Sequence, residues 1–219
     1  PALPMLIKSL RADMGVMITA SHNTYEYNGL KFFDFNGDKI SRDLEIKIEK
    51  ILSNKERYRK ISSLGFESGK AVRLMDAAGR YSEYLKSTLD KKIKLKKFKV
   101  VLDCGNGATY NIAPTLFWEL GSEVCSINDR PNGRNINKNC GAINIKELSK
   151  KVLSVKANIG FAFDGDGDRL IVVDEKGNLV DGDKIIALFS KNYLKKNILK
   201  KKTVVTTVMS NLGLEHYLK

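Results

Sequence analysis

The sequence contains few residues of the kinds that form cross-links or bind soft metals. It has three cysteines and two histidines in 219 residues. The cysteines, Cys104, Cys125 and Cys140, are odd in number and show no CxxC spacing, which argues against a disulfide framework and against a zinc site. We therefore expect a protein of the reducing cytoplasm.

Long apolar runs are also missing from the sequence. No run approaches the roughly 20 residues that a membrane-spanning helix needs, and the first residues, PALPMLIKSLRADMG, lack the pattern of a secretory signal peptide. These absences argue against a membrane protein and a secreted one. The sequence does not begin with methionine, so we expect the chain to start within a longer protein.

Positive charge is in excess, with a formal net charge of +13. The electrostatic field of this positive charge attracts any anion, whether nucleic acid, anionic lipid or phosphorylated metabolite. Many of the lysines lie in two clusters that lack the interleaved aromatic residues of a nucleic-acid stacking surface. We therefore expect solvated lysines at the ends of elements and no nucleic-acid partner. The clusters are Lys91, Lys92, Lys94, Lys96 and Lys97, and Lys195, Lys196, Lys200, Lys201 and Lys202.

Short β-branched runs alternate with helical periodicity along the sequence, which predicts an α/β fold. Ser41 is expected to cap a charged helix that reaches about Ser53. The other expected helices are 112–120, 145–155, 183–195 and 211–218. The expected strands are 14–19, 30–33, 99–103, 123–127, 158–164, 170–174 and 203–208, with a short further strand near Val180.

The string FDGDGDR, which directly follows a predicted strand, places Asp164, Asp166 and Asp168 between glycines. Glycine lets the backbone turn tightly, so these three carboxylates can converge on one point. Without a cation they would repel each other strongly. Oxygen ligands favour Mg²⁺ or Ca²⁺ over zinc, so the sequence predicts a site for a hard cation.

Two alternatives remain for this acidic string. An EF-hand loop would use Glu175, the twelfth residue counted from Asp164, as a ligand. However, Arg169 occupies the sixth position, where an EF-hand has glycine, and the predicted flanks are strands. The second alternative is a solvated acidic turn without a metal.

A second candidate site begins at Ser21, which follows a predicted strand in the string TASHN. His22 is adjacent in sequence, but neighbouring loop residues rarely face each other as a serine–histidine pair requires, and no GxSxG string is present. A turn-forming serine is the alternative. Asn28-Gly29 is a turn signal that would bring Lys31 back toward the serine. A serine, a lysine and an acidic metal loop together suggest phosphoryl transfer.

These strings resemble motifs of the α-D-phosphohexomutase family. TASHNTYEYNGLK is similar to the family's phosphoserine loop and DGDGDR to its metal loop, while GNGATYNIAPTLFWELG and NGRNINKNCGA are similar to connecting segments of its phosphoglucosamine mutase branch. The resemblance implies successive α/β domains, incomplete at both ends. Residues 1–79 would end the first domain, 80–180 would form the second, and 181–219 would begin the third.

The resemblance also implies roles for particular residues. Ser21 would be the phosphorylated serine and Lys31 the general acid/base, with His22 and Arg169 supporting the charge of the phosphoryl group. The implied ligands of Mg²⁺ are the phosphate on Ser21 together with Asp164, Asp166 and Asp168.

The implied activity is an intramolecular phosphotransfer of the isomerase class. Glucosamine 6-phosphate would become glucosamine 1-phosphate, a precursor for the cell wall, through a 1,6-bisphosphate. Tyr27 before Asn28-Gly29 is more similar to the phosphomannomutase or phosphoglucomutase branch, which is the alternative activity. Thr24 departs from the proline that the family usually has at this place. The family's GExSGH and RxSGTE loops do not occur in the sequence. The chain is thus expected to be either a fragment of an active mutase, completed by other domains or by a homo-oligomer, or a catalytically inactive truncated remnant.

Overall fold

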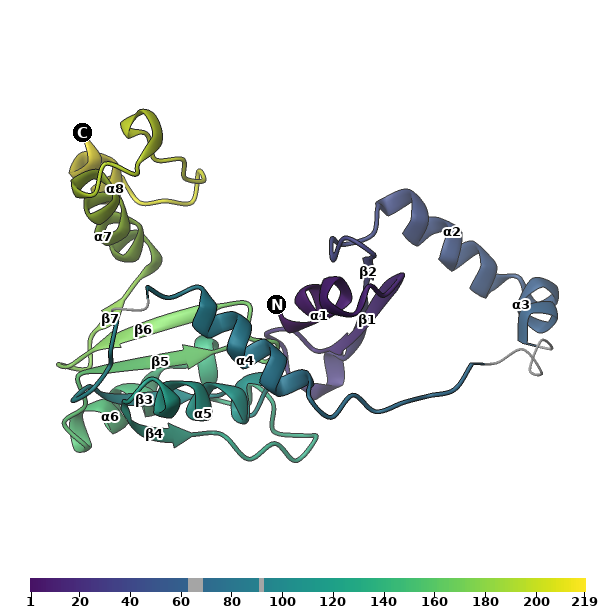
Figure 1. Ribbon diagram of the computed structural model, residues 1–219, viewed down its shortest axis with the longest axis horizontal. Helices are drawn as coiled ribbons and strands as arrows, with labels where there is room; N and C mark the ends of the chain where they lie inside the picture. The colour runs from purple at the N-terminus through teal and green to yellow at the C-terminus, as the bar shows by residue number, and fades with distance from the viewer. Residues whose placement is uncertain (63–68, 91–92) are drawn as a thin grey trace. The chain divides into compact units, whose positions relative to one another are not determined.

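The computed structural model describes residues 1–62, 69–90 and 93–219, which belong to two compact units (Figure 1). The first unit consists of Pro1–Ala20 and Glu26–Ile93, and the second of Ser21–Tyr25 and Lys94–Lys219. A short piece of chain carrying the candidate serine therefore leaves the first unit and belongs to the second.

The first unit is built on two antiparallel strands, β1 (Met14–Thr19) and β2 (Gly29–Asp34). The register pairs Met17 with Lys31. Its helices are α1 (Ala2–Leu10), α2 (Arg42–Ser53), α3 (Lys55–Ser62) and α4 (Ala77–Ser87). The side chain of Ser41 accepts a hydrogen bond from the Leu44 amide at 3.3 Å, which confirms the predicted cap.

The second unit contains a mixed sheet of five strands. The strands are β3 (Lys99–Asp103), β4 (Glu123–Ile127), β5 (Ile159–Phe163), β6 (Leu170–Asp174) and β7 (Leu179–Val180). Their order is β4-β3-β5-β6-β7; β3 runs parallel to β4 and β5, and the last two pairings are antiparallel.

Helices follow strands of this unit as far as residue 195, as the predicted α/β pattern requires, and the last helix has no strand directly before it. The helices are α5 (Ile112–Glu119), α6 (Lys146–Ser154), α7 (Gly182–Lys195) and α8 (Leu212–Leu218). Short 3₁₀ turns are η1 (Tyr25–Tyr27), which runs from the second unit into the first, and η3 (Ala108–Tyr110), η4 (Gly141–Ile143) and η5 (Lys200–Lys202).

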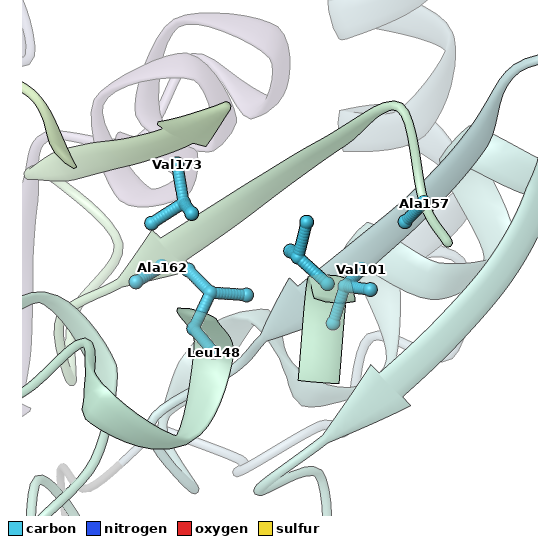
Figure 2. Packing of buried hydrophobic residues seen from close by; sticks show 6 residues of the cluster. Val101, Leu148, Ala157, Ala162 and Val173 are labelled. Carbon is cyan, nitrogen blue, oxygen red and sulfur yellow. The ribbon is translucent and has the colours of Figure 1, made fainter. Parts of the chain in front are cut away.

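Buried side chains on both faces of the sheet form two hydrophobic clusters. Successive residues of a strand point to opposite faces, so Val101 joins one cluster and Val100 the other. Figure 2 shows Leu148 of α6 against Val101, Ala162 and Val173 of the sheet. The opposite cluster includes Ala113 of α5. The sheet is thus covered by α6 on one face and α5 on the other.

Replacing Leu148 with alanine is expected to destabilise the second unit. The side chain has no exposed surface, and its loss leaves a cavity, so the free energy of unfolding should fall by about 2–5 kcal/mol. Urea unfolding followed by circular dichroism measures the change. Leu153→Ala on the same helix is the control, since Leu153 is 53% exposed and should cost far less. Equal losses in the two variants would contradict this packing.

The strand predicted at 203–208 is wrong: 203–207 has no regular secondary structure, Val208 begins a turn, and neither sheet of the described residues includes this segment. A strand needs a neighbour to satisfy its backbone groups. Val205 and Val208 are instead 90% and 101% exposed. The turn signal Asn28-Gly29 lies where the connection between β1 and β2 ends: Gly29 pairs with Thr19, and 20–28 connects the strands.

The structure also bears on the first lysine cluster and on the question of a membrane-spanning helix. Lys91 and Lys92 of the first lysine cluster lie outside the described residues. Of the helices in the described ranges, none combines the length and the apolar character needed to cross a bilayer.

Candidate functional site

The acidic string lies at the end of β5. Because β3 and β5 are parallel, the loops that follow them share one edge of the sheet, where α/β proteins commonly bind ligands. One oxygen from each of Asp164, Asp166 and Asp168 lies within 4.8 Å of the others. The predicted convergence of the three carboxylates is confirmed.

The environment of this triad disfavours three uncompensated negative charges. Asp164 is fully buried and Asp166 is 8% exposed. Burial raises the pKa of Asp164, as do the neighbouring Asp168 and Asp166, while a hydrogen bond from the Arg169 amide at 3.1 Å opposes the shift. The Oδ2 atom of Asp164 is buried without a hydrogen-bond partner among the described residues. A cation would satisfy this oxygen and neutralise the repulsion, so the triad could hold a metal ion.

The loop around the triad differs from an EF-hand. It is flanked by β5 and β6, which form an antiparallel pair, where an EF-hand has helices. Glu175 is exposed in the turn after β6 and does not belong to the group of three. The geometry therefore favours a carboxylate site on a sheet edge.

Main-chain contacts from the turn after β3 support the acidic loop. The turn after β3 contributes Ala108, whose amide donates to the carbonyl of Gly165 at 2.8 Å. A Cβ atom at Gly107 would overlap the same carbonyl oxygen, so the two loops approach more closely than any larger residue permits. The acidic loop is thus held by main-chain packing as well as by its own turn.

Asp103, at the end of β3, is a buried carboxylate with a different role. It accepts hydrogen bonds from the amides of Gly105 at 3.0 Å and Gly141 at 2.9 Å, and from the side chain of Asn128 at 3.2 Å. Burial raises its pKa, and these three bonds oppose the shift. Asp103 therefore ties together loops on the edge that carries the triad.

The candidate serine lies beside this acidic loop. The carbonyl oxygen of Ser21 lies 2.6 Å from where a Cβ atom at Gly165 would stand, and Gly165 separates Asp164 from Asp166. The side-chain amide of Asn137 donates to the carbonyls of Ser21 at 2.9 Å and of Asn23 at 2.8 Å. The structure thus brings the serine main chain and the metal loop together within one unit.

The remaining predicted residues are distributed over both units. His22 follows Ser21, and its Nδ1 atom is buried with no hydrogen-bond partner in the described part of the chain. Arg169 ends the acidic loop with an exposed side chain. Lys31 is half-buried on β2 and belongs to the first unit. Only Lys31 of the seven predicted site residues therefore lies outside the second unit.

Family models match the chain in three consecutive segments. They describe the phosphoglucomutase/phosphomannomutase alpha/beta/alpha domain I at residues 1–59, domain II at 79–177 and domain III at 181–219. The chain belongs to this phosphohexomutase family.

Curated relatives of this phosphohexomutase chain are about twice as long. The phosphoglucosamine mutase of Thermodesulfovibrio yellowstonii is 50% identical over 219 residues, covering all of this chain and 48% of the relative. That of Bartonella bacilliformis is 49% identical over 218 residues, again with 48% of the relative covered. The chain spans about half the length of the curated relatives it matches.

Solved structures agree on the fold. A phosphoglucomutase/phosphomannomutase family protein of Burkholderia thailandensis is 32% identical, with a TM-score of 0.62 over 84% of this chain and 38% of that one. An N-acetylphosphoglucosamine mutase of Aspergillus fumigatus is 21% identical, with a TM-score of 0.52 over 91% of this chain and 53% of the Aspergillus chain. The second likeness supports the fold alone.

Two features of this phosphohexomutase site were not predicted from the sequence. They are the amide of Asn137, which binds the serine segment, and Gly107, which supports the acidic loop. The string NINKN lies in a segment that resembles the family, but nothing in it indicated a contact with Ser21, because Asn137 lies 116 residues after Ser21. Glycine in the turn after β3 was a weak signal for the second.

A large cavity in this phosphohexomutase chain lies away from the acidic loop, and two buried cysteines are poor nucleophiles. A cavity of about 1020 Å³ is lined only by residues from 190–219, none of them in the acidic loop. A smaller one of about 440 Å³ adjoins Thr24 and Asn137. Burial raises the pKa of Cys104 to about 12 and of Cys140 to about 11, so both stay neutral thiols and are poor nucleophiles.

Proposed function

We propose that this chain carries the phosphoserine and metal loops of a phosphoglucosamine mutase, an isomerase that interconverts glucosamine 6-phosphate and glucosamine 1-phosphate. The observation that carries the proposal is the contact between the main chain of Ser21 and Gly165, in the middle of the acidic triad. The phosphoglucosamine mutases that are about 50% identical over the whole chain support the choice of sugar.

In this proposal Ser21 carries the phosphoryl group at the metal loop. The proposed ligands of Mg²⁺ are the phosphate on Ser21 and the carboxylates of Asp164, Asp166 and Asp168. A bound Mg²⁺ would neutralise negative charge on the phosphoryl oxygens and so favour transfer. Arg169 would add fixed positive charge, and His22 would add a hydrogen-bond donor for the same oxygens.

The proposed reaction has two transfers. The C1 hydroxyl of glucosamine 6-phosphate attacks the phosphorus on Ser21, and the bond to the serine oxygen breaks, giving glucosamine 1,6-bisphosphate. After the bisphosphate has turned over in the site, the Ser21 hydroxyl attacks the 6-phosphoryl group and glucosamine 1-phosphate leaves. We propose Lys31 as the group that accepts the proton of the attacking hydroxyl and returns it to the leaving oxygen.

The organisation that we propose follows the family. Residues 1–79 supply the end of the first domain with the phosphoserine loop, 80–180 form the second with the metal loop, and 181–219 begin the third. The reducing cytoplasm, where amino-sugar precursors of the cell wall are made, is the proposed location, and the free thiols Cys104, Cys125 and Cys140 are compatible with it.

Mass spectrometry tests the proposal directly. The purified chain is incubated with Mg²⁺ and glucosamine 1,6-bisphosphate, and we expect the mass of one phosphoryl group to appear on the peptide that contains Ser21. Omitting Mg²⁺ is expected to prevent the labelling, because the charge of the incoming phosphate is then not neutralised. A folded chain that binds Mg²⁺ but takes up no phosphate would contradict the proposal.

A further inference from the structure

Asn137 is a fully buried polar residue in a segment that resembles the family, but neither that resemblance nor the triad assigns it a role. It lies in the loop between β4 and α6, and its amide nitrogen donates to two carbonyl oxygens of one short segment, at Ser21 and Asn23. Its own main-chain amide donates to the carbonyl of Gly105 at 2.8 Å. Burying an N–H donor is costly unless it is hydrogen-bonded, so the amide nitrogen of Asn137 favours the arrangement of the segment that offers it two carbonyl oxygens. The Oδ1 atom of Asn137 is buried without a hydrogen-bond partner among the described residues and does not add to this preference.

The same amide touches the acidic loop. A Cβ atom at Gly165 would stand 2.7 Å from the amide nitrogen of Asn137 and 2.6 Å from the carbonyl oxygen of Ser21. Asn137 is therefore packed between the serine segment and the residue that joins Asp164 to Asp166. One side chain fixes the separation of the two loops.

The backbone of Ser21 needs such support. Its φ angle is 54°, in the left-handed region that residues other than glycine seldom adopt. The hydrogen bonds that Ser21 and Asn23 accept from Asn137 hold the segment on both sides of His22 in this conformation. Without them, the segment would relax toward commoner backbone angles and carry the serine oxygen with it.

We propose that Asn137 is a positioning residue for phosphoryl transfer: its amide fixes the main chain of Ser21 against the acidic loop, so that serine and carboxylates share one phosphate. The proposal rests on the proposed function, in which Ser21 accepts the phosphoryl group. Asn137 does not touch the reacting atoms and acts through the serine segment. A misplacement of about 1 Å costs roughly 100-fold in rate when geometry is the main catalytic device.

Asn137→Ala and Asn139→Ala form a matched pair for the test. Both asparagines lie in one loop with φ angles of 56° and 57°, so alanine causes the same backbone strain in each. Asn139 is exposed, so its loss removes no buried contact. Asn137→Asp is a third variant, because it keeps the shape of the side chain but replaces the donor with an oxygen that faces two carbonyls.

Hydrogen exchange measures the placement of the segment without any assumption about function. In Asn137→Ala and Asn137→Asp we expect amides of Ser21–Tyr25 to exchange on the order of tenfold faster, because the segment opens more often when its carbonyl oxygens lose the two hydrogen bonds from Asn137. The amides of β5 should exchange as in the wild type, and Asn139→Ala should change neither segment. Equal rates in Asn137→Ala and Asn139→Ala, or equally faster exchange in β5, would overturn the positioning role.

The rate of Ser21 phosphorylation supplies the second readout. We expect Asn137→Ala to slow labelling by roughly 100-fold while the affinity for Mg²⁺ changes less than twofold, because the triad itself is intact. A parallel loss of both would indicate general damage and overturn the proposal. If the wild type takes up no phosphate, the proposed function fails, and the exchange rates still decide whether Asn137 places the segment.

Discussion

Replacing Ser21 with alanine is expected to abolish phosphate incorporation into the chain. The substitution removes the oxygen that we propose as the phosphoryl acceptor, and we do not expect His22, the adjacent side chain, to replace it while Asn137 holds the backbone of the segment. Mass spectrometry after incubation with Mg²⁺ and glucosamine 1,6-bisphosphate measures the effect. A loss of more than about 1,000-fold is expected, as for other nucleophile deletions.

Thr24→Ala is the control for this variant. Thr24 has a hydroxyl in the same Ser21–Tyr25 segment, and its removal should leave labelling within a few-fold of the wild type. Metal binding by Ser21→Ala should persist, because the carboxylates remain. Phosphate that still appears on the Ser21→Ala chain, at Thr24 or elsewhere, would contradict the assignment of the acceptor.

Replacing Asp166 with alanine is expected to weaken Mg²⁺ binding by roughly 100-fold or more, because removal of an outer-shell partner alone costs 10–100-fold and Asp166 is proposed as a direct ligand. The metal-free protein should become no less stable, because the substitution removes the negative charge of Asp166 that repels the carboxylate of Asp164. Calorimetric titration gives the affinity. The rise in Tm on adding Mg²⁺ should shrink in the variant.

Glu175→Gln is the matched control for the acidic loop. It also removes one carboxylate from the second unit, but from an exposed turn outside the triad. We expect unchanged affinity for Mg²⁺. An equal loss in both variants would mean that the cation responds to net charge or to an EF-hand type of site, and would contradict the triad.

Much of the fold could be predicted because local sequence determines local structure. The β-branched run at 99–103 indicated a strand, which the structure confirms as β3, and its Val100, Val101 and Leu102 are at most 2% exposed. Ser41 indicated where α2 begins, because a side-chain oxygen there satisfies a free amide. The segment 203–208 has the same β-branched composition, but a strand also depends on a neighbour elsewhere in the chain. Composition alone could not reveal that this neighbour is missing from the described residues.

The candidate site likewise combines features that depend on local sequence with features that depend on distant residues. The convergence of Asp164, Asp166 and Asp168 was predictable, because the spacing and the glycines that produce it lie within a few residues. The contact between Asn137 and Ser21 spans 116 residues and has no local pattern. It could be recognised only after the sheet had brought the loops to one edge.

The division of the chain into units has a consequence for its biosynthesis. Ser21–Tyr25 belongs to the second unit, whereas the residues on either side of it belong to the first. A ribosome makes the chain from its N-terminus and domains fold as they emerge, so Ser21 appears 116 residues before the asparagine that seats it. The serine segment is therefore held against the acidic loop only after Asn137 and the loop at 164–168 have been translated, so the phosphorylation of Ser21 that we propose is expected to follow the synthesis of that part of the second unit.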